Sequence, residues 1–312
     1  MKPSIETISI IGAGALGAAY GGLLHDMDVR SVSFVAGGNR FERLRNEGLI
    51  VNGKRYIIPV VLPEDLSAPA DLIIVAVKYH HLDDAIRDMR NRVGAETAII
   101  SVMNGIESEE RIGSVYGMGK VLYAVSVAID ALREGNRVNY RNQGKIFFGE
   151  ARNTFLTERV KHIQALFDKA GINYETPPDM MRVMWWKFMI NVGINQASAV
   201  LRAPFLVFQT SEEARNLMES AMLEVIRLSE KAGVNLTHED IERFNKILLD
   251  MNPQGKTSML QDVEARRKTE VEMLAGKVIA LGRQYNVSTP VNQRLFDLIK
   301  EIEEKYDSAN VT

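Results

Sequence analysis

Apolar and polar residues follow two different patterns along the chain, and the change falls near its middle. In the first half, short and nearly continuous apolar runs alternate with amphipathic segments. Strands that are apolar on both faces and separated by helices are typical of a parallel sheet covered on both sides. The pattern predicts strands at 7–12, 31–36, 71–77 and 97–103 and helices at 15–27, 39–48 and 82–93. The first half is therefore expected to form a doubly wound α/β domain.

Later segments of the first half are expected to add to this architecture. Residues 49–58 are predicted to form a hairpin that turns at Asn52-Gly53, a dipeptide favoured in tight β-turns. The apolar runs 120–130 and 137–150 are expected to add antiparallel strands late in the domain.

From about Thr154 onwards the pattern changes to long helices, with one extended piece at 172–178. Pro177-Pro178 cannot continue a helix, so this pair marks the predicted domain boundary. We predict an N-terminal α/β domain over residues 1–177 and an all-helical C-terminal domain over 178–312. The C-terminal helices are predicted at 179–201, 211–232, 238–250, 258–285 and 291–305.

Composition narrows the class of protein. The chain has 312 residues, of which 46% are hydrophobic and 25% charged, as in soluble globular proteins. A formal net charge of -2 argues against a nucleic-acid partner or an anionic membrane surface, because both require a basic binding face. The absence of cysteine excludes disulfides, thiolate nucleophiles and zinc–thiolate sites.

The sequence contains few indications of metal binding, cellular targeting or oligomeric assembly. The five histidines are too scattered for a recognisable ligand motif, and no metal is predicted. No apolar run is long enough for a signal peptide or a membrane span, so a cytoplasmic location is expected. A homodimer through the helical domain stays open, because helix faces that pair subunits resemble those that pack in a core.

A glycine-rich turn follows the first predicted strand. Gly12, Gly14 and Gly17 form a G-x-G-x-x-G arrangement where a helix begins. Such glycines permit a tight turn, the approach of a pyrophosphate to the backbone and close packing of helix on strand. The alternative is a tight turn that binds nothing. Dinucleotide binding of the Rossmann type is favoured, and the predicted cofactor-binding turn is Gly12, Ala13, Gly14, Ala15, Leu16 and Gly17.

The end of the second predicted strand bears on which dinucleotide binds. NAD-specific folds place a carboxylate there, on the adenosine ribose. Here Ala36, Gly37 and Gly38 carry no carboxylate, and Arg40 and Arg43 follow closely enough to bind a 2′-phosphate. The alternative is that both arginines belong to a solvated helix face. The sequence favours NADP, bound as NADPH, over NAD.

Polar residues also follow the later strands of the predicted sheet. Lys78 and Asn104 lie where ligands bind in open α/β sheets, beyond the carboxyl ends of strands. Lysine can neutralise a phosphate, and asparagine can donate to a carboxamide or to a substrate oxygen. Ala128 is small enough to line a cofactor groove, although sheet packing explains it equally well. The alternative for Lys78 and Asn104 is an exposed polar residue in an ordinary turn.

A narrow polar stripe runs along the apolar helix predicted at 179–201. Lys187, Asn191 and Asn195 recur every fourth residue within an arc of about 80°, and their flanks are apolar. Such a stripe is expected to face a lined cavity, unless Lys187 reaches the surface and the asparagines bond to backbone. A desolvated lysine can stabilise and protonate the oxygen of a ketone that accepts a hydride, and asparagines can fix substrate oxygens.

Ser258 and Glu270 are weaker candidates. They are twelve residues apart on the helix predicted at 258–285, which places them more than three turns apart. They could reach a shared site only if the ligand or cofactor spans that length. Taken alone, each is more commonly a cap or part of a solvated face.

Several of these motifs together resemble the ketopantoate reductases (2-dehydropantoate 2-reductases). They are the opening "GAGALG", Lys78, Asn104-Gly105, "WWKFMINVGIN" and "SMLQDVEARRKTEVE", which match in order over nearly the whole chain. The resemblance implies an N-terminal Rossmann domain that binds NADPH and a helical C-terminal domain. It also implies reduction of 2-dehydropantoate to pantoate on the route to pantothenate.

The same resemblance implies roles for single residues. Lys187 is similar to the family's proton donor, and Asn104 to a residue that contacts both cofactor and substrate. The residues similar to substrate contacts are Lys187, Asn191, Asn195 and Ser258, and those similar to cofactor-side groups are Lys78, Ala128 and Glu270.

Three positions depart from the family pattern. Gly255 and Phe205 stand where asparagines are expected, and Gly37 stands where an arginine often ends the second strand. A different 2-oxo acid is therefore an alternative substrate. A non-catalytic NADP-binding sensor, which would need the glycines and Arg40 but not Lys187, is the alternative from another class.

Overall fold

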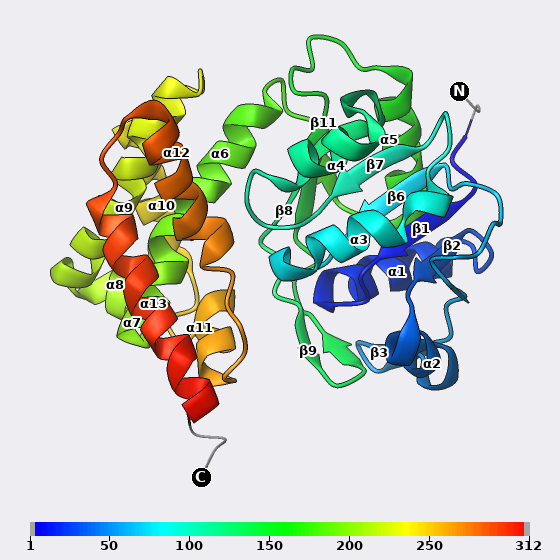
Figure 1. The fold of residues 1–312 in the computed structure, drawn as a ribbon, viewed down its shortest axis with the longest axis horizontal. Coiled ribbons are helices and arrows are strands. Elements are labelled where there is room, and N and C mark those ends of the chain that lie inside the picture. Colours follow the sequence, from blue (N-terminus) through cyan, green and yellow to red (C-terminus); the bar gives the residue numbers. More distant parts are fainter. Residues whose placement is uncertain (1–3, 309–312) are drawn as a thin grey trace. The chain divides into compact units, whose positions relative to one another are not determined.

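The computed structural model describes residues 4–308, and its internal contacts separate two compact units that divide after Val183. The first unit is an α/β domain of the Rossmann type and the second is helical, which confirms the predicted fold class (Figure 1). The contacts change over within helix α6 (Met180–Ile190), shortly after Pro177-Pro178. The boundary placed at these prolines stays a prediction.

The first unit is built on a doubly wound sheet. Its strand order is β12-β11-β8-β7-β6-β1-β2-β5, and all neighbouring pairs are parallel except β11 with β8. The late antiparallel strand was predicted. The strands are β1 (Ile8–Ile11), β2 (Val32–Val35), β5 (Val60–Val61), β6 (Leu72–Val75), β7 (Ala98–Ser101), β8 (Val121–Val127), β11 (Lys145–Gly149) and β12 (Tyr174–Glu175).

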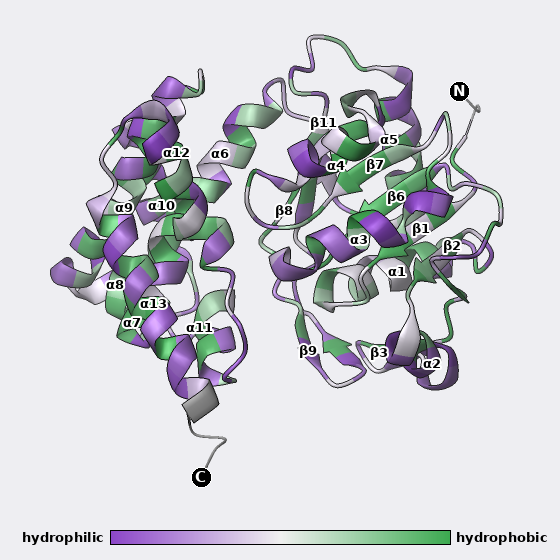
Figure 2. Ribbon diagram, viewed as in Figure 1, coloured by the Kyte–Doolittle hydropathy of each residue, from purple (hydrophilic) through white to green (hydrophobic). Residues whose placement is uncertain are grey.

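Helices cover both faces of this sheet, which explains why the strands are apolar without alternation. Ile74 packs in a core with α1 and α5, whereas its neighbour Ile73 packs in a second core with α3 and α4. Figure 2 shows the central strands in the green of hydrophobic residues. The helices are α1 (Ala15–Met27), α2 (Gly38–Glu47), α3 (Leu82–Asp88), α4 (Ser108–Tyr116) and α5 (Glu158–Ala170).

A second, smaller sheet lies beside α2 in the first unit (Figure 1). Its order is β4-β3-β10-β9, with strands β3 (Leu49–Val51), β4 (Lys54–Tyr56), β9 (Leu132–Glu134) and β10 (Arg137–Asn139). The predicted hairpin at Asn52-Gly53 is confirmed, with both residues at positive φ. The predicted strand region 137–150 is divided between the two sheets, because β10 pairs with β3 while β11 pairs with β8.

The second unit contains the helices predicted at 179–201, 211–232, 238–250 and 291–305, within the usual boundary error. A short helix, α8, was not predicted. It begins directly after Pro204. The elements are α6, the π-helical segment η4 (Asn191–Asn195), α7 (Gln196–Leu201), α8 (Phe205–Thr210), α9 (Glu212–Lys231), α10 (His238–Asp250), α11 (Ser258–Glu264), the π-helical segment η5 (Glu272–Gly276), α12 (Lys277–Tyr285) and α13 (Pro290–Ser308).

The continuous helix predicted at 258–285 is wrong. Helix α11 ends at Glu264, and Arg266 adopts a left-handed conformation with φ 51°. The Glu303 carboxylate, on α13, accepts hydrogen bonds of 2.7 Å from both the backbone N and the Oγ1 of Thr269. The Glu303 side chain, distant in sequence, therefore satisfies polar groups of Thr269 within the break. Because α11 ends at Glu264, Ser258 and Glu270 do not lie on one helix.

Candidate active site

The glycine turn joins β1 to α1 in a geometry that two of its glycines make necessary. A Cβ on Gly12, which has φ 102°, would lie 2.6 Å from the carbonyl oxygen of Ala76. A Cβ on Gly17 would lie 1.9 Å from the carbonyl oxygen of Gly12. At Gly14, by contrast, the nearest atom would be 3.7 Å away, so the protein leaves room in front of this residue.

The turn also presents hydrogen-bond donors. Gly14 is the N-cap residue of α1 and has no side chain to accept from the N–H groups of the first turn. Ala15 and Leu16, which begin the helix, are half-buried, and Ala13 is buried. Helix N-termini of this kind bind phosphate groups through backbone N–H. The residues of the turn therefore fit the pyrophosphate of a dinucleotide.

Lys78 and Asn104 lie at the same edge of the sheet as this turn. Val75 pairs with Ser101 across β6 and β7, and Val75 also pairs with Ile11 of β1. Lys78 and Asn104 therefore occupy equivalent positions just beyond two neighbouring strands, and both are half-buried. The structure brings these two residues to the edge where the glycine turn begins.

Ala128 and Arg40 follow other strands of that sheet. Ala128 comes directly after β8, is exposed and has φ 59°, so sheet packing does not explain it. Arg40 is exposed on α2, which begins shortly after β2.

The polar stripe of the second unit runs from α6 into η4. Asn191 and Asn195 are each 8% exposed, and Lys187 is half-buried. Because η4 is π-helical, its turns are wider than those of an α-helix, and the arc of about 80° predicted for the three residues does not hold across it. Single π-helical turns occur frequently at functional sites.

Local contacts explain why the chain adopts this wider turn. The Nε2 of Gln196 donates to the carbonyl of Val192 at 2.7 Å, and the Oγ of Ser198 donates to the carbonyl of Asn195 at 3.2 Å. A Cβ on Gly193 would lie 2.9 Å from the carbonyl oxygen of Met218, so glycine lets η4 approach α9 closely. Side chains and close packing thus replace part of the α-helical hydrogen bonding.

Lys187 is placed in an electrostatic environment that suits proton transfer. Burial lowers the pKa of the Lys187 ammonium to about 8, and the negative charge of Glu270 partly opposes this effect. Glu270 is 6% exposed and lies at the end of the break between α11 and η5. The charge of Glu270 therefore acts on Lys187, an interaction that the predicted continuous helix did not show.

Ser258 is the first residue of α11 and is exposed. It does not cap the helix, because the N-cap is Thr257, whose Oγ1 accepts from the backbone N of Leu260. The Thr257 Oγ1 also lies 2.5 Å from the Oγ of Ser198, which ties the start of α11 to α7. Helix α11, which begins at Ser258, and η5, which begins two residues after Glu270, both pack against η4 of the stripe.

Two residues that depart from the family pattern contact one another. A Cβ on Gly255 would lie 2.8 Å from the Cδ2 of Phe205, and the backbone N of Phe205 donates to the Gly255 carbonyl at 3.0 Å. The phenyl ring therefore occupies the space that a side chain at 255 would need. Sequence position alone did not show that these two departures are coupled.

Arg133 was not identified from the sequence. Its Nη1 donates to the carbonyl of Ala13 inside the glycine turn, although it lies on β9 of the small sheet. No motif marks this arginine, because the contact depends on how the two sheets of the unit are arranged.

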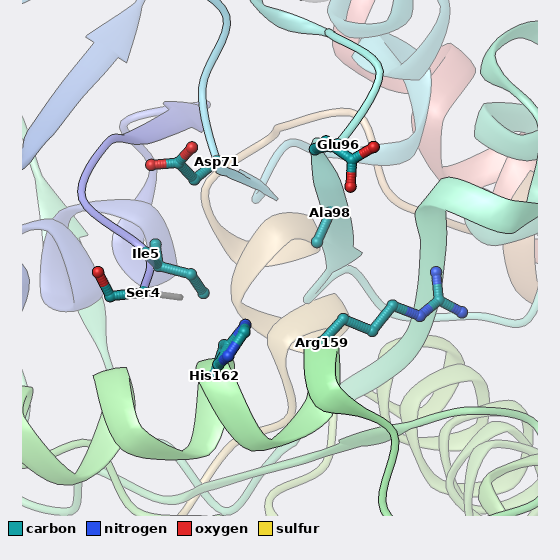
Figure 3. Close-up of a pocket in the computed structure, with 7 residues that line it drawn as sticks. All are labelled: Ser4, Ile5, Asp71, Glu96, Ala98, Arg159 and His162. Atoms are coloured by element: carbon teal, nitrogen blue, oxygen red, sulfur yellow. The ribbon is translucent and has the colours of Figure 1, made fainter. Parts of the chain in front are cut away.

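A cavity elsewhere in the first unit lies away from the glycine turn. Asp71 and Ala98 stand at the amino ends of β6 and β7, whereas the turn follows the carboxyl end of β1 (Figure 3). Asp71 accepts hydrogen bonds of 3.0 Å from the backbone N of Glu6 and of Thr7. The lining residues are Ser4, Ile5, Asp71, Glu96, Ala98, Arg159 and His162. This cavity is at the wrong edge of the sheet for the predicted cofactor.

The part of the chain that the structure describes contains neither a metal-binding cluster nor a membrane-spanning helix. Within 4–308, no group of three or more His, Asp or Glu side chains is placed to hold a metal ion. No helix in the same range combines the length and the apolar character needed to cross a membrane.

Known proteins resemble this chain over both units. The sequence model of a family described as Ketopantoate reductase PanE/ApbA matches residues 8–153, and its C-terminal counterpart matches residues 179–303. The 2-dehydropantoate 2-reductase of Pyrococcus horikoshii is 26% identical over 299 residues, covering 94% of this chain and 96% of the relative.

Two solved structures share the fold. The 2-dehydropantoate 2-reductase from Geobacter metallireducens has a TM-score of 0.83 and 26% identity, covering 95% of this chain and 99% of that one. D-mandelate dehydrogenase, solved with NADH and anilino(oxo)acetate, has a TM-score of 0.86 at 22% identity, covering 96% of this chain and 99% of that one.

Proposed function

The chain belongs to the ketopantoate reductase family of oxidoreductases, and from this premise we propose that it reduces 2-dehydropantoate to pantoate with NADPH. The proposal includes a place in pantothenate biosynthesis. The observation that carries the chemistry is the Lys187 ammonium, which burial brings to a pKa of about 8 beside Glu270. General acids act best when their pKa lies near the operating pH.

Lys187 is proposed as the proton donor. Reduction of a ketone adds a hydride to the carbonyl carbon and a proton to the carbonyl oxygen, and reduced nicotinamide supplies the hydride when bound. Negative charge that develops on the oxygen is stabilised by the Lys187 ammonium, which then gives up a proton from Nζ and becomes a neutral amine. Arginine could not replace it in this step, because its guanidinium does not deprotonate in proteins.

The remaining groups are assigned to binding. The turn from Gly12 to Gly17 would hold the pyrophosphate through backbone N–H, and Arg40 would hold the 2′-phosphate. Lys78, Asn104 and Ala128 follow strands at the same sheet edge and are assigned to the cofactor side. Asn191, Asn195 and Ser258, together with Asn104, are assigned to the substrate. Glu270 is assigned to the cofactor side as well, and to tuning Lys187.

The contact between Phe205 and Gly255 favours a second candidate substrate. Both positions lack the amide groups that the family pattern places there to bind a hydroxyl. A phenyl ring packed over glycine offers an apolar edge instead, which would favour a 2-oxo acid with an apolar side chain. D-mandelate dehydrogenase, which shares the fold, is known in complex with anilino(oxo)acetate, an oxo acid with an aromatic group.

Turnover by the purified protein tests these proposals. NADPH oxidation is measured with 2-dehydropantoate and with a panel of 2-oxo acids that carry apolar or aromatic side chains. Highest kcat/KM with 2-dehydropantoate supports the main proposal, whereas highest kcat/KM with an apolar oxo acid supports the second. No turnover with any of them, despite tight NADPH binding, would favour a sensor.

Lys187→Ala separates catalysis from cofactor binding. Loss of a general acid is expected to lower kcat by about 10² to 10⁴. NADPH affinity, measured by titration of the protein without substrate, should change little. Lys246→Ala, at an exposed position on α10, is the control and should leave both quantities unchanged. An equal loss of turnover and NADPH affinity in Lys187→Ala contradicts the donor role.

A further inference from the structure

Arg133 connects the small sheet to the glycine turn. It is half-buried on β9, and its Nη1 donates to the carbonyl of Ala13, 120 residues away in sequence. Its Nε donates to the carbonyl of Gly135 at 2.8 Å. These two hydrogen bonds fix the plane of the guanidinium beside the turn that is proposed to bind the dinucleotide.

Two further arginines lie within electrostatic reach of Arg133. Burial lowers the pKa of the Arg133 guanidinium, and the positive charges of Arg43 and Arg40 lower it further. Arg40 and Arg43 come from α2, whereas Arg133 comes from β9. Three cations from two elements of the first unit therefore converge near the glycine turn.

Such a cluster is electrostatically unfavourable without an anion. Like charges repel, and repulsion is stronger for a group that is partly removed from water, as Arg133 is. Within residues 4–308, Arg133 donates to backbone carbonyls and to no carboxylate. A guanidinium has five N–H donors, and two of them are used in these bonds, so three remain for a ligand.

The position of the cluster indicates which phosphate it serves. Arg40 and Arg43 follow the end of β2, where Rossmann folds place the adenosine ribose and its 2′-phosphate. The pyrophosphate is already served by the backbone N–H groups at the start of α1. Arginine also suits a phosphate monoester, since its planar fork can donate two parallel hydrogen bonds.

We propose that Arg133 is a specificity-determining residue that, with Arg40 and Arg43, binds the 2′-phosphate of the cofactor and selects NADPH over NADH. This inference rests on the proposed cofactor-binding function of the glycine turn. It does not depend on which 2-oxo acid is reduced. It adds a cation from the small sheet, which lies outside the sequence motif that places Arg40.

Binding measurements on the full chain test the inference. NADPH, NADH and adenosine 2′,5′-bisphosphate are titrated calorimetrically into the wild type, Arg133→Gln and the control Arg137→Gln, which changes an exposed arginine of the neighbouring strand β10. Arg133→Gln should lower the affinity for NADPH and for the bisphosphate by about tenfold to a hundredfold, as expected for loss of a charged hydrogen-bond partner. NADH affinity should change by less than about twofold. Arg137→Gln should bind all three ligands as the wild type does.

A second variant distinguishes loss of 2′-phosphate binding from a folding defect, which Arg133→Gln could also cause because Arg133 anchors the glycine turn. Arg43→Gln removes an exposed member of the cluster that lies on α2, outside the glycine turn. This variant should also lower the affinity for NADPH more than the affinity for NADH. An equal loss of both cofactors in Arg133→Gln, together with no selective loss in Arg43→Gln, overturns the inference.

The outcomes also separate this inference from the proposed reductase function. A wild type that binds NADPH selectively but reduces no 2-oxo acid leaves the Arg133 assignment standing and refutes the reductase. A wild type that binds NADH as tightly as NADPH refutes the assignment and leaves reduction with NADH open. A wild type that binds neither dinucleotide refutes both.

Discussion

Replacing Glu270 with glutamine should move the pH dependence of the reaction without removing Lys187, the proposed proton donor. The Glu270 carboxylate is the opposite charge that partly offsets the effect of burial on Lys187. Its loss leaves burial unopposed, so the pKa of Lys187 should fall from about 8 by roughly one unit. Glutamine keeps the volume of the buried side chain and one of its two acceptor oxygens, which limits other effects.

The size of the effect follows from the protonated fraction of Lys187. For a proton donor, kcat/KM is highest when the ammonium is charged and falls as pH rises through its pKa. At a pH equal to the wild-type pKa of about 8, half of the wild type is protonated. A pKa lower by one unit leaves roughly a tenth protonated, so the variant should be about fivefold slower. At a pH two units below the wild-type pKa, the kcat/KM values of the wild type and the variant should differ little.

The assay is a pH profile of kcat/KM for NADPH oxidation with the best 2-oxo acid. Glu272→Gln is the matched control, because Glu272 is half-buried two residues away but pairs with Lys300 at 3.0 Å. It should keep the wild-type midpoint. A Glu270→Gln profile with an unshifted midpoint, or a loss that is the same at every pH, would refute the electrostatic reasoning. The uniform loss would instead support a binding role for Glu270.

Two further predictions concern the first unit. Burial raises the pKa of Glu109 to about 7, whereas the same group in the unfolded chain releases its proton near pH 4.5. Between these two pH values the folded protein holds a proton that the unfolded chain has lost. The free energy of unfolding should therefore fall by on the order of 3 kcal/mol as the pH rises from 4.5 to 7. Urea unfolding across this range should show that fall in the wild type and a flatter dependence in Glu109→Gln, and parallel curves would contradict it. Gly17→Ala should abolish NADPH binding or folding of the unit, because its Cβ would overlap the Gly12 carbonyl oxygen. Gly119→Ala, where a Cβ meets no atom within 4 Å and the backbone is not at positive φ, should keep binding in the same titration. Tight NADPH binding by Gly17→Ala would show that the turn can move.

The elements that the sequence predicted well are those whose signal is contained within one short segment. The parallel strands were recognisable because both faces of each are buried, as Ile73 and Ile74 show. The glycine turn was recognisable because its steric demands fall on residues within one short segment. The polar stripe was recognisable because apolar residues flank it on both sides.

The elements that the sequence did not predict depend on partners far along the chain. The break after α11 is held by Glu303 through Thr269, 34 residues away, and periodicity cannot show such a contact. The π-helical turn at η4 depends on the approach of α9 over Gly193. An α-helical period therefore described the composition of the stripe but not the directions of its side chains.

The same distinction separates the two kinds of residue in the candidate site. Groups that act through the backbone, such as the N–H groups after Gly14, are fixed by local sequence and so appear in a motif. Groups that act through charge depend on what the fold brings beside them: Glu270 alters Lys187 only because the chain breaks before η5. Arg133 likewise reaches Ala13 only because the small sheet forms beside α2. Substrate and cofactor preference in this family should therefore vary through such distant charged and packed residues while the glycine motif stays the same, and Phe205, Gly255 and Arg133 are the positions at which this chain tests that expectation.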